Sequence, residues 1–306
     1  MGKIKLKISA QLNIGLKREN NEDNIYLNGD YIKPRDSLPY KNTLTFENGV
    51  FAVCDGMGGE EHGEYASLCG VKTLADYNDR MLETEDREGL VNALIEDINS
   101  QICAEIKRKS VRIGSTISIL CINNGMADIF NIGDSRVYLI RKNKLTQLSL
   151  DHTLVRQKVD MGIITKEQAE TDRDKHKLTQ HLGIFPDEML IEAYHITEKV
   201  KVHDEFLICS DGLTDMLSDN DIEEIVNFSE TTEQATDLLM KKALGNGGKD
   251  NTSIVLIKVS AGDEKQKKRR QGKTWVPIVV ILVLLITGII MEMNFGFIKN
   301  LFNWLF

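Results

Sequence analysis

Strand-like and helix-like patterns of apolar residues alternate along the chain as far as Ser260. Residues 3–9, KIKLKIS, alternate lysine with apolar residues, which predicts a half-buried strand. Residues 50–54, VFAVC, are continuously apolar and lead into DGMGG, which predicts a buried strand ending in a tight loop. Residues 64–83 and 87–108 are predicted helices, and in the second one apolar residues recur at spacings of three and four.

The rest of this region predicts hairpins, shorter helices and further strands. STISILCI and MADIFNI flank a predicted hairpin turn at Asn124-Gly125, and RVYLI and LTQLS flank a second turn at RKNK. EFLICS and TSIVLIKV predict two more strands. Thr165 and Gln168 have the spacing of a capping box. Shorter helices are predicted at residues 152–161, 165–170, 219–227 and 231–244. This pattern indicates an α+β sandwich, with two packed sheets flanked by helices.

The composition changes abruptly after Gly262, where DEKQKKRRQGK is followed by WVPIVVILVLLITGIIM without a charge. An apolar stretch of this length is at the short end of what crosses a bilayer, about 17–25 residues. A buried core helix is the alternative, but such a helix usually has a polar face. We therefore expect a folded domain over residues 1–260, a charged basic linker over 261–274, a transmembrane helix over 275–291 and a short hydrophobic interfacial tail over 292–306. Because basic residues precede the helix, a single-pass membrane protein with its folded domain in the cytoplasm is expected.

Overall composition excludes some classes of protein. The formal net charge of -8 does not favour nucleic-acid binding. The five cysteines form no Cys-x-x-Cys pair, which argues against a zinc site or a disulfide framework.

Candidate chemistry lies in acidic residues that follow strands or sit in glycine-flanked turns. They are Glu22 and Asp23 in NED, Asp55 after FAVC, Asp134 after FNIG, Asp211 after FLICS and Asp250 in GGKDN. Any one of them could be an ordinary turn residue. Several strand ends that converge would instead bring the carboxylates together, where they could not all stay ionised without cations. Carboxylate oxygens without histidine or thiol partners favour Mg²⁺ or Mn²⁺, so metal-assisted phosphoester chemistry is expected, in either a phosphatase or a nuclease.

The same residues carry a resemblance to a known family. R-x-x-N-E-D at residues 18–23, VCDGMGGEEHGEYAS, GST, NIGDSRVYLI, LSLDHTLV, LTQHLG, CSDGLTDMLSDNDI and GGKDNTSIVLI occur in this order. Together they resemble the protein phosphatase 2C family, the PPM class of serine/threonine phosphatases, in its bacterial form. The resemblance extends from about residue 8 to residue 259. It implies an αββα sandwich of two antiparallel sheets and an enzyme that hydrolyses phosphoserine and phosphothreonine in proteins.

The resemblance also implies roles for individual residues. Asp55 would bridge two Mn²⁺ or Mg²⁺ ions, with the carbonyl of Gly56 and the carboxylate of Glu22 at one ion. Asp23 would not bind a metal itself but would orient a metal-bound water, and Arg18 would bind the phosphate. The ligands of the other ion would be Asp211 and Asp250, and those of a third, weaker ion shared with Asp211 would be Asp134 and Asp215.

The mechanism implied is direct attack on phosphorus by a hydroxide that bridges the metals. Many eukaryotic members have a histidine after the DG pair, assigned as general acid, whereas this chain has Met57, so water is the expected proton donor. Residues 161–176 match the mobile flap of bacterial members.

By analogy with the family, the expected substrates are phosphoproteins, and the expected partners are Hanks-type kinases and their targets. The predicted transmembrane helix would also contact membrane lipid. Two alternatives stay open: a catalytically weak, membrane-tethered phosphoprotein-binding module, and a phosphatase of anti-sigma-factor antagonists.

Overall fold

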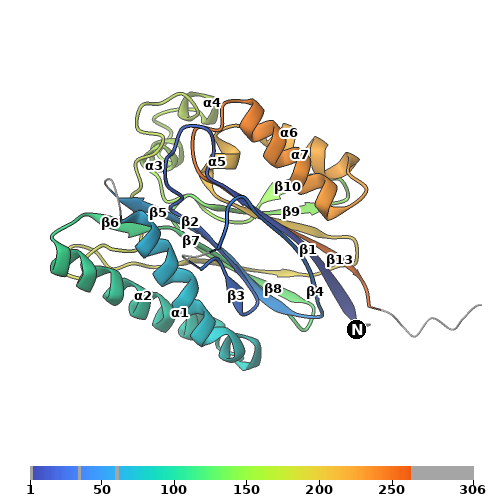
Figure 1. Ribbon diagram of the computed structural model, residues 1–306, viewed down its shortest axis with the longest axis horizontal. Coiled ribbons are helices and arrows are strands. Elements are labelled where there is room, and N and C mark those ends of the chain that lie inside the picture. Colours follow the sequence, from blue (N-terminus) through green and yellow to red (C-terminus); the bar gives the residue numbers. More distant parts are fainter. Residues whose placement is uncertain (1–2, 34–35, 59–61, 263–306) are drawn as a thin grey trace, which may run out of the picture. The chain divides into compact units, whose positions relative to one another are not determined.

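Two antiparallel sheets pack face to face in the computed structural model, which describes residues 3–33, 36–58 and 62–262 (Figure 1). The six-stranded sheet has the order β10 (Lys144–Gln147), β9 (Arg136–Arg141), β12 (Glu205–Cys209), β13 (Thr252–Ala261), β1 (Ile4–Asn13) and β4 (Tyr40–Phe46). The seven-stranded sheet has the order β11 (Tyr194–Lys199), β8 (Met126–Ile132), β7 (Ile117–Asn123), β5 (Gly49–Gly58), β2 (Asp23–Leu27) and β3 (Asp30–Tyr31), and β6 (Ile113–Ser115) pairs with β5.

Helices cover the outer face of each sheet, which completes the predicted αββα sandwich (Figure 1). Helices α1 (Gly63–Glu83) and α2 (Arg87–Lys109) lie on the seven-stranded sheet. Helices α6 (Asp219–Phe228) and α7 (Thr232–Gly245) lie on the six-stranded sheet. The short helices α3 (Leu154–Asp160), α4 (Lys166–Ala169) and α5 (Asp211–Thr214) lie in the connections. The fold class predicted from the sequence is confirmed.

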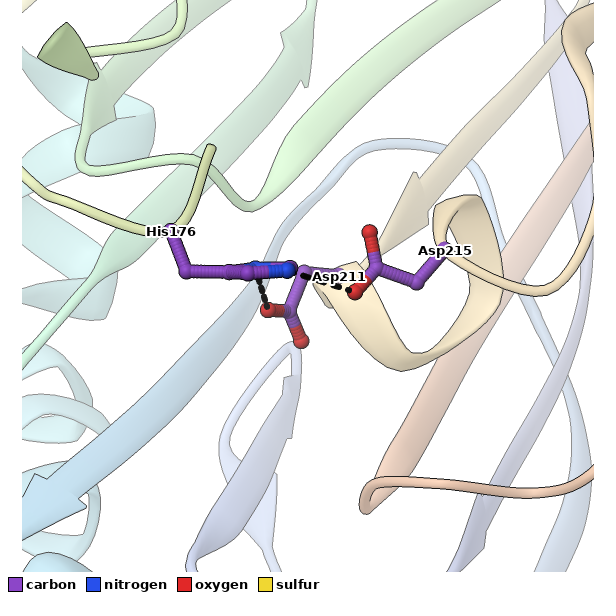
Figure 2. Close-up of side chains that lie close together, drawn as sticks. All are labelled: His176, Asp211 and Asp215. Atoms are coloured by element: carbon purple, nitrogen blue, oxygen red, sulfur yellow. Dashed lines mark ion pairs between the residues drawn. The ribbon is translucent and has the colours of Figure 1, made fainter. Parts of the chain in front are cut away.

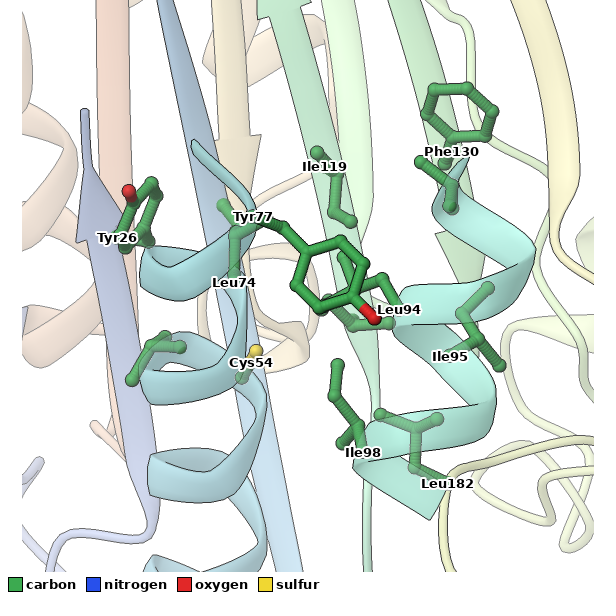
Figure 3. Close-up of a cluster of buried hydrophobic side chains, with 14 of the residues drawn as sticks. Tyr26, Cys54, Leu74, Tyr77, Leu94, Ile95, Ile98, Ile119, Phe130 and Leu182 are labelled. Atoms are coloured by element: carbon green, nitrogen blue, oxygen red, sulfur yellow. The ribbon is translucent and has the colours of Figure 1, made fainter. Parts of the chain in front are cut away.

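Three apolar cores hold these layers together. The core between the sheets contains the inward residues of β1, β5 and β13, among them Ile8, Phe51 and Ile257, which are fully buried. A second core lies between the seven-stranded sheet and α1 and α2, where Leu74 and Leu94 face the strands (Figure 3). The third core packs α6 and α7 against the other sheet. This layering follows from the sequence patterns, because the continuously apolar strands are those buried on both faces.

Local signals in the sequence are also borne out. Asn124 and Gly125 both have positive φ, 49° and 75°, as the predicted two-residue hairpin turn requires. The capping box of Thr165 and Gln168 is formed at α4. The six helices predicted before residue 260 are all present, with ends that differ from the prediction by a few residues.

The segment from residue 28 to residue 49, which the sequence marks only as a long polar excursion, contains β3 and β4. Strand β4 pairs with β1 and is the edge of its sheet.

Residues 3–262 belong to one compact unit, Met1–Gly262. The predicted transmembrane helix and tail, and the predicted linker from residue 263 onward, lie outside the described residues. Within the described part of the chain, no helix is both long enough and apolar enough to span a bilayer.

Candidate active site

A polar cleft of about 590 Å³ opens where strands of both sheets end. Strands β12 and β13 are antiparallel neighbours, so the end of β12 and the start of β13 lie side by side. The same holds for the start of β2 and the end of β5, where Asp23 is paired with Asp55. Eight of the nine predicted site residues line the cleft: Arg18, Glu22, Asp55, Gly56, Asp134, Asp211, Asp215 and Asp250.

The ninth, Asp23, is buried beside the cleft. Its side chain is 3% exposed, and its Oδ2 accepts hydrogen bonds from the hydroxyls of Ser210 and Ser253, each at 2.7 Å. Both serines belong to the other sheet, Ser210 directly after β12 and Ser253 in β13. Asp23 therefore connects the two sheets under the cleft.

Asp55 is held by its backbone while its side chain faces the cleft. Its N–H donates to the hydroxyl of Thr116 at 3.0 Å, and its carbonyl accepts from the N–H of Thr116 at 2.9 Å and from the hydroxyl of Ser115 at 3.0 Å. These contacts leave the carboxylate free to act on whatever occupies the cleft.

Close backbone packing brings Glu22 next to Gly56. The N–H of Gly56 donates to the carbonyl of Glu22 at 3.1 Å, and the Glu22 carboxylate accepts from the N–H of Gly63 at 3.2 Å. A side-chain Cβ on Gly56 would lie 2.1 Å from the carbonyl oxygen of Gly63, so only glycine fits there. Asn251 completes this corner, because its Oδ1 accepts from the N–H of Glu22 at 2.7 Å.

Asp211 and Asp215 are placed by the single turn of α5. The N–H of Asp215 donates to the carbonyl of Asp211 at 2.8 Å, so both carboxylates emerge on one side, as predicted from their spacing. Oδ1 of Asp211 is buried and has no hydrogen-bond partner among the described residues. Oδ1 of Asp215 accepts from Lys175 Nζ at 2.6 Å.

Arg18 lies across the mouth of the cleft and contacts Asp250. Its Nη2 donates to Oδ2 of Asp250 at 2.6 Å, and half of the arginine side chain is exposed. The guanidinium therefore keeps further N–H groups for an oxyanion that enters the cleft.

The carboxylates raise one another's pKa. Burial, with the neighbouring Asp211, raises the pKa of Asp23 to about 7, although the hydrogen bonds from Ser210 and Ser253 oppose the change. Burial and the proximity of Asp211 raise the pKa of Asp134 to about 8. Burial, with Asp23, Asp211 and Asp134 nearby, raises the pKa of Asp55 well above its ordinary value. Burial and Asp211 also raise the pKa of Asp250, although Arg18 opposes the change.

A group of carboxylates with these properties fits divalent cations. Asp211 has a buried oxygen without a partner among the described residues, and full ionisation of the group is unfavourable without added positive charge. Every predicted ligand offers oxygen, which hard cations such as Mg²⁺ and Mn²⁺ prefer.

Several residues of the site were not predicted. Thr116, Ser210, Ser253 and Asn251 position the acids through hydrogen bonds, and all four lie within the motifs that carry the family resemblance, although no role was predicted for them. His176 also reaches the cleft, where its ring lies 3.7 Å from Asp211 and 3.5 Å from Asp215. The sequence placed it only in the segment that resembles a flap.

Comparison with known proteins agrees with this geometry. The protein phosphatase 2C family matches residues 36–246. The chain is 32% identical over 248 residues to the serine/threonine phosphatase stp of Listeria monocytogenes, covering 79% of this chain and 92% of that protein. It is 32% identical over 263 residues to the protein phosphatase PhpP of Streptococcus pneumoniae, covering 84% and 99%.

Solved structures give the same result. The serine/threonine phosphatase PstP of Mycobacterium tuberculosis superposes with a TM-score of 0.71 at 29% identity, covering 84% of this chain and 99% of that one. A structure of the PstP catalytic domain in complex with two manganese ions superposes with a TM-score of 0.69 at the same identity and coverage. The chain therefore belongs to the protein phosphatase 2C family of metal-dependent serine/threonine phosphatases.

Proposed function

We propose that this chain hydrolyses phosphoserine and phosphothreonine in proteins with Mn²⁺ or Mg²⁺ as cofactor, and that its C-terminal segment holds it at the cytoplasmic face of a membrane. The convergence of eight predicted site residues in one cleft supports the chemistry. Hanks-type kinases and their targets are the partners that we propose by family analogy.

Two cations bound in the cleft would activate water and offset the charge of the phosphate. The chain's own residues would hold them: Asp55, Gly56 and Glu22 from the β2–β5 side of the cleft, and Asp211 and Asp250 from the β12–β13 side. Asp23 has no access to the cleft surface and would fix the positions of the acids through its serine hydrogen bonds. Arg18 would bind two phosphate oxygens with its planar fork, which a lysine cannot do.

A peptide assay tests the chemistry. The full-length chain, purified in mild detergent, is given a phosphothreonine peptide with Mn²⁺, with Mg²⁺ or with EDTA. We expect hydrolysis with either metal and none with EDTA, and loss of turnover in Asp55→Asn. Asp187→Asn, an exposed carboxylate outside the cleft, is the matched control. Activity that persists in EDTA, or none with either metal, would contradict the proposal, and phosphopeptide binding without turnover would favour the binding-module alternative.

The membrane tether rests on the sequence of residues 275–291, which carry no charge and follow a basic stretch. Carbonate extraction of membranes from cells that express the full chain tests it. We expect the chain to stay in the membrane pellet, and a variant with Leu284→Asp and Leu285→Arg to be released. Release of the unaltered chain by carbonate would rule out a spanning helix.

A further inference from the structure

The segment between α4 and residue 177 returns to the cleft and places the imidazole of His176 against two carboxylates of α5. Nδ1 of His176 lies 3.7 Å from Oδ2 of Asp211, and Nε2 lies 3.5 Å from Oδ2 of Asp215. Figure 2 shows the ring edge directed at both carboxylates, with His176 on a connecting segment and the two acids on one helical turn. Each separation is longer than a hydrogen bond between nitrogen and oxygen.

A given cation can be bound by only one of the two ring nitrogens, and either separation has the size expected between two ligands of one metal ion. Ligand atoms at about 2.1 Å from a cation lie about 3–4 Å from one another. In the described part of the chain, His176, Asp211 and Asp215 each offer one ligand atom, and the three atoms lie within 4.8 Å of one another.

Both carboxylates have oxygens that remain available. Asp211 Oδ1 is buried and has no hydrogen-bond partner among the described residues. At Asp215, Lys175 Nζ holds Oδ1 at 2.6 Å, which orients the carboxylate and leaves Oδ2 toward the histidine. Asp134 lines the same cleft and supplies a further carboxylate.

We propose that an imidazole nitrogen of His176 is a ligand of a divalent cation that it binds together with Asp211 and Asp215. This inference rests on the proposed metal-dependent function and adds a nitrogen ligand to a site in which the sequence predicted oxygen alone. The cation would thereby fasten the segment around His176 to α5, across the mouth of the cleft.

The nitrogen ligand determines which cation this position prefers. Carboxylate and water oxygens suit both Mn²⁺ and Mg²⁺, but Mn²⁺ is a transition metal and accepts an imidazole nitrogen more readily than Mg²⁺ does. The position should therefore bind Mn²⁺ in preference to Mg²⁺, and this preference should weaken in His176→Gln, whose side-chain oxygen can still act as a ligand.

Pulsed electron paramagnetic resonance tests the ligand directly. The full-length chain, purified in mild detergent and carrying ¹⁵N only in its histidines, is titrated with Mn²⁺. We expect the Mn²⁺ signal to show coupling to ¹⁵N, and this coupling to disappear in His176→Gln. His203→Asn is the matched control, because His203 is exposed, has a φ of 75° that asparagine tolerates, and does not line the cleft.

Titration calorimetry with Mn²⁺ and with Mg²⁺ provides a second readout. His176→Gln should weaken the weakest Mn²⁺ site at least about tenfold, as loss of groups that support metal ligands does. Its Mg²⁺ affinity should change less, and the control should match the unaltered chain.

The outcomes separate this inference from the proposed function. Mn²⁺ binding and turnover without ¹⁵N coupling, or coupling that persists in His176→Gln, would overturn the histidine ligand and leave the phosphatase intact. Absence of both Mn²⁺ binding and turnover would overturn the proposed function and the inference with it.

Discussion

The cluster of acids in the cleft should make the metal-free protein lose stability as pH rises. A carboxyl group whose pKa is raised by folding binds its proton more tightly in the folded protein than in the unfolded chain. The folded state then holds more protons between the two pKa values, so the free energy of unfolding falls with rising pH across that range. For Asp23, with a pKa of about 7, the range ends near pH 7, and for Asp134 it ends near pH 8.

The size of the effect follows from these values. Each pH unit within the range costs about 1.4 kcal/mol for each such group. Between pH 5 and pH 8, Asp23 alone should therefore remove ~3 kcal/mol from the metal-free protein. This is a large part of the ~5–15 kcal/mol that stabilises a typical domain, and Asp134 acts in the same direction.

Urea unfolding of the full-length chain in EDTA at pH 5, 6, 7 and 8 measures this loss. Asp23→Asn keeps the size of the side chain and can accept the same serine hydrogen bonds, but it carries no charge. Between pH 5 and pH 8, the free energy of unfolding should fall by ~3 kcal/mol less in the variant than in the unaltered chain. At pH 8 the variant should have the higher free energy of unfolding.

Saturating Mn²⁺ should remove most of the pH dependence above pH 6, because the cations offset the carboxylate charge. Asp187→Asn, outside the cleft, should leave the dependence unchanged. A metal-free stability that rises with pH, or the same slope in Asp23→Asn, would refute the reasoning.

Three further changes test single contacts. Gly212→Ala would bring a Cβ to 2.0 Å from the backbone oxygen of Asn251, so we expect weaker Mn²⁺ binding by calorimetry and a lower melting temperature. Gly245→Ala is the control, because nothing lies within 4 Å of its Cβ position, and it should leave Mn²⁺ binding unchanged and stability equal or slightly higher. Arg18→Lys loses the planar fork, and loss of one charge-assisted hydrogen bond of ~1.5–3 kcal/mol should lower kcat/KM for phosphopeptide about tenfold to a hundredfold. Asp204→Ala removes a buried carboxylate that accepts from Arg141 at 2.8 Å and leaves the guanidinium its contact with Glu198 at 3.2 Å, so loss of this charge-assisted hydrogen bond should cost ~1.5–3 kcal/mol of unfolding free energy in urea melts while the folded enzyme keeps its specific activity.

The elements of the fold were predictable where a pattern is strong. The long helices α1 and α2 have a helical periodicity, and the continuously apolar runs of β5 and β13 are short and flanked by turn residues, which favours strands. Strand β4 was missed because it is an edge strand whose alternate residues are only partly buried, so its alternation is weak. Its place in the sheet depends on pairing with β1, which is close in space and distant in sequence.

The site was predictable where acidic residues come at or directly after the end of an apolar run. Asp55 lies near the end of the buried strand β5 and Asp211 comes shortly after β12, and converging strand ends bring such residues together. The residues that support them act through hydrogen bonds, Thr116 within one sheet and Ser253 between the two sheets, and the motifs that contain these residues do not reveal which contacts they make. His176 could not be placed, because a polar connecting segment does not reveal where it folds back.

The proposed metal ligands belong to both sheets, so the site that we propose can exist only where the two sheets are held in fixed register. Asp55 and Glu22 come from the β2–β5 side, whereas Asp211 and Asp250 come from the β12–β13 side. Apolar packing between the sheets is non-directional and does not set positions to a fraction of an ångström. Directional bonds do: Asp23 accepts from a serine at the end of β12 and from another in β13, and Asn251 bonds the backbone of Glu22. These few buried polar contacts, and not the size of the core, therefore determine whether the two halves of the site meet at the spacing that a pair of cations requires.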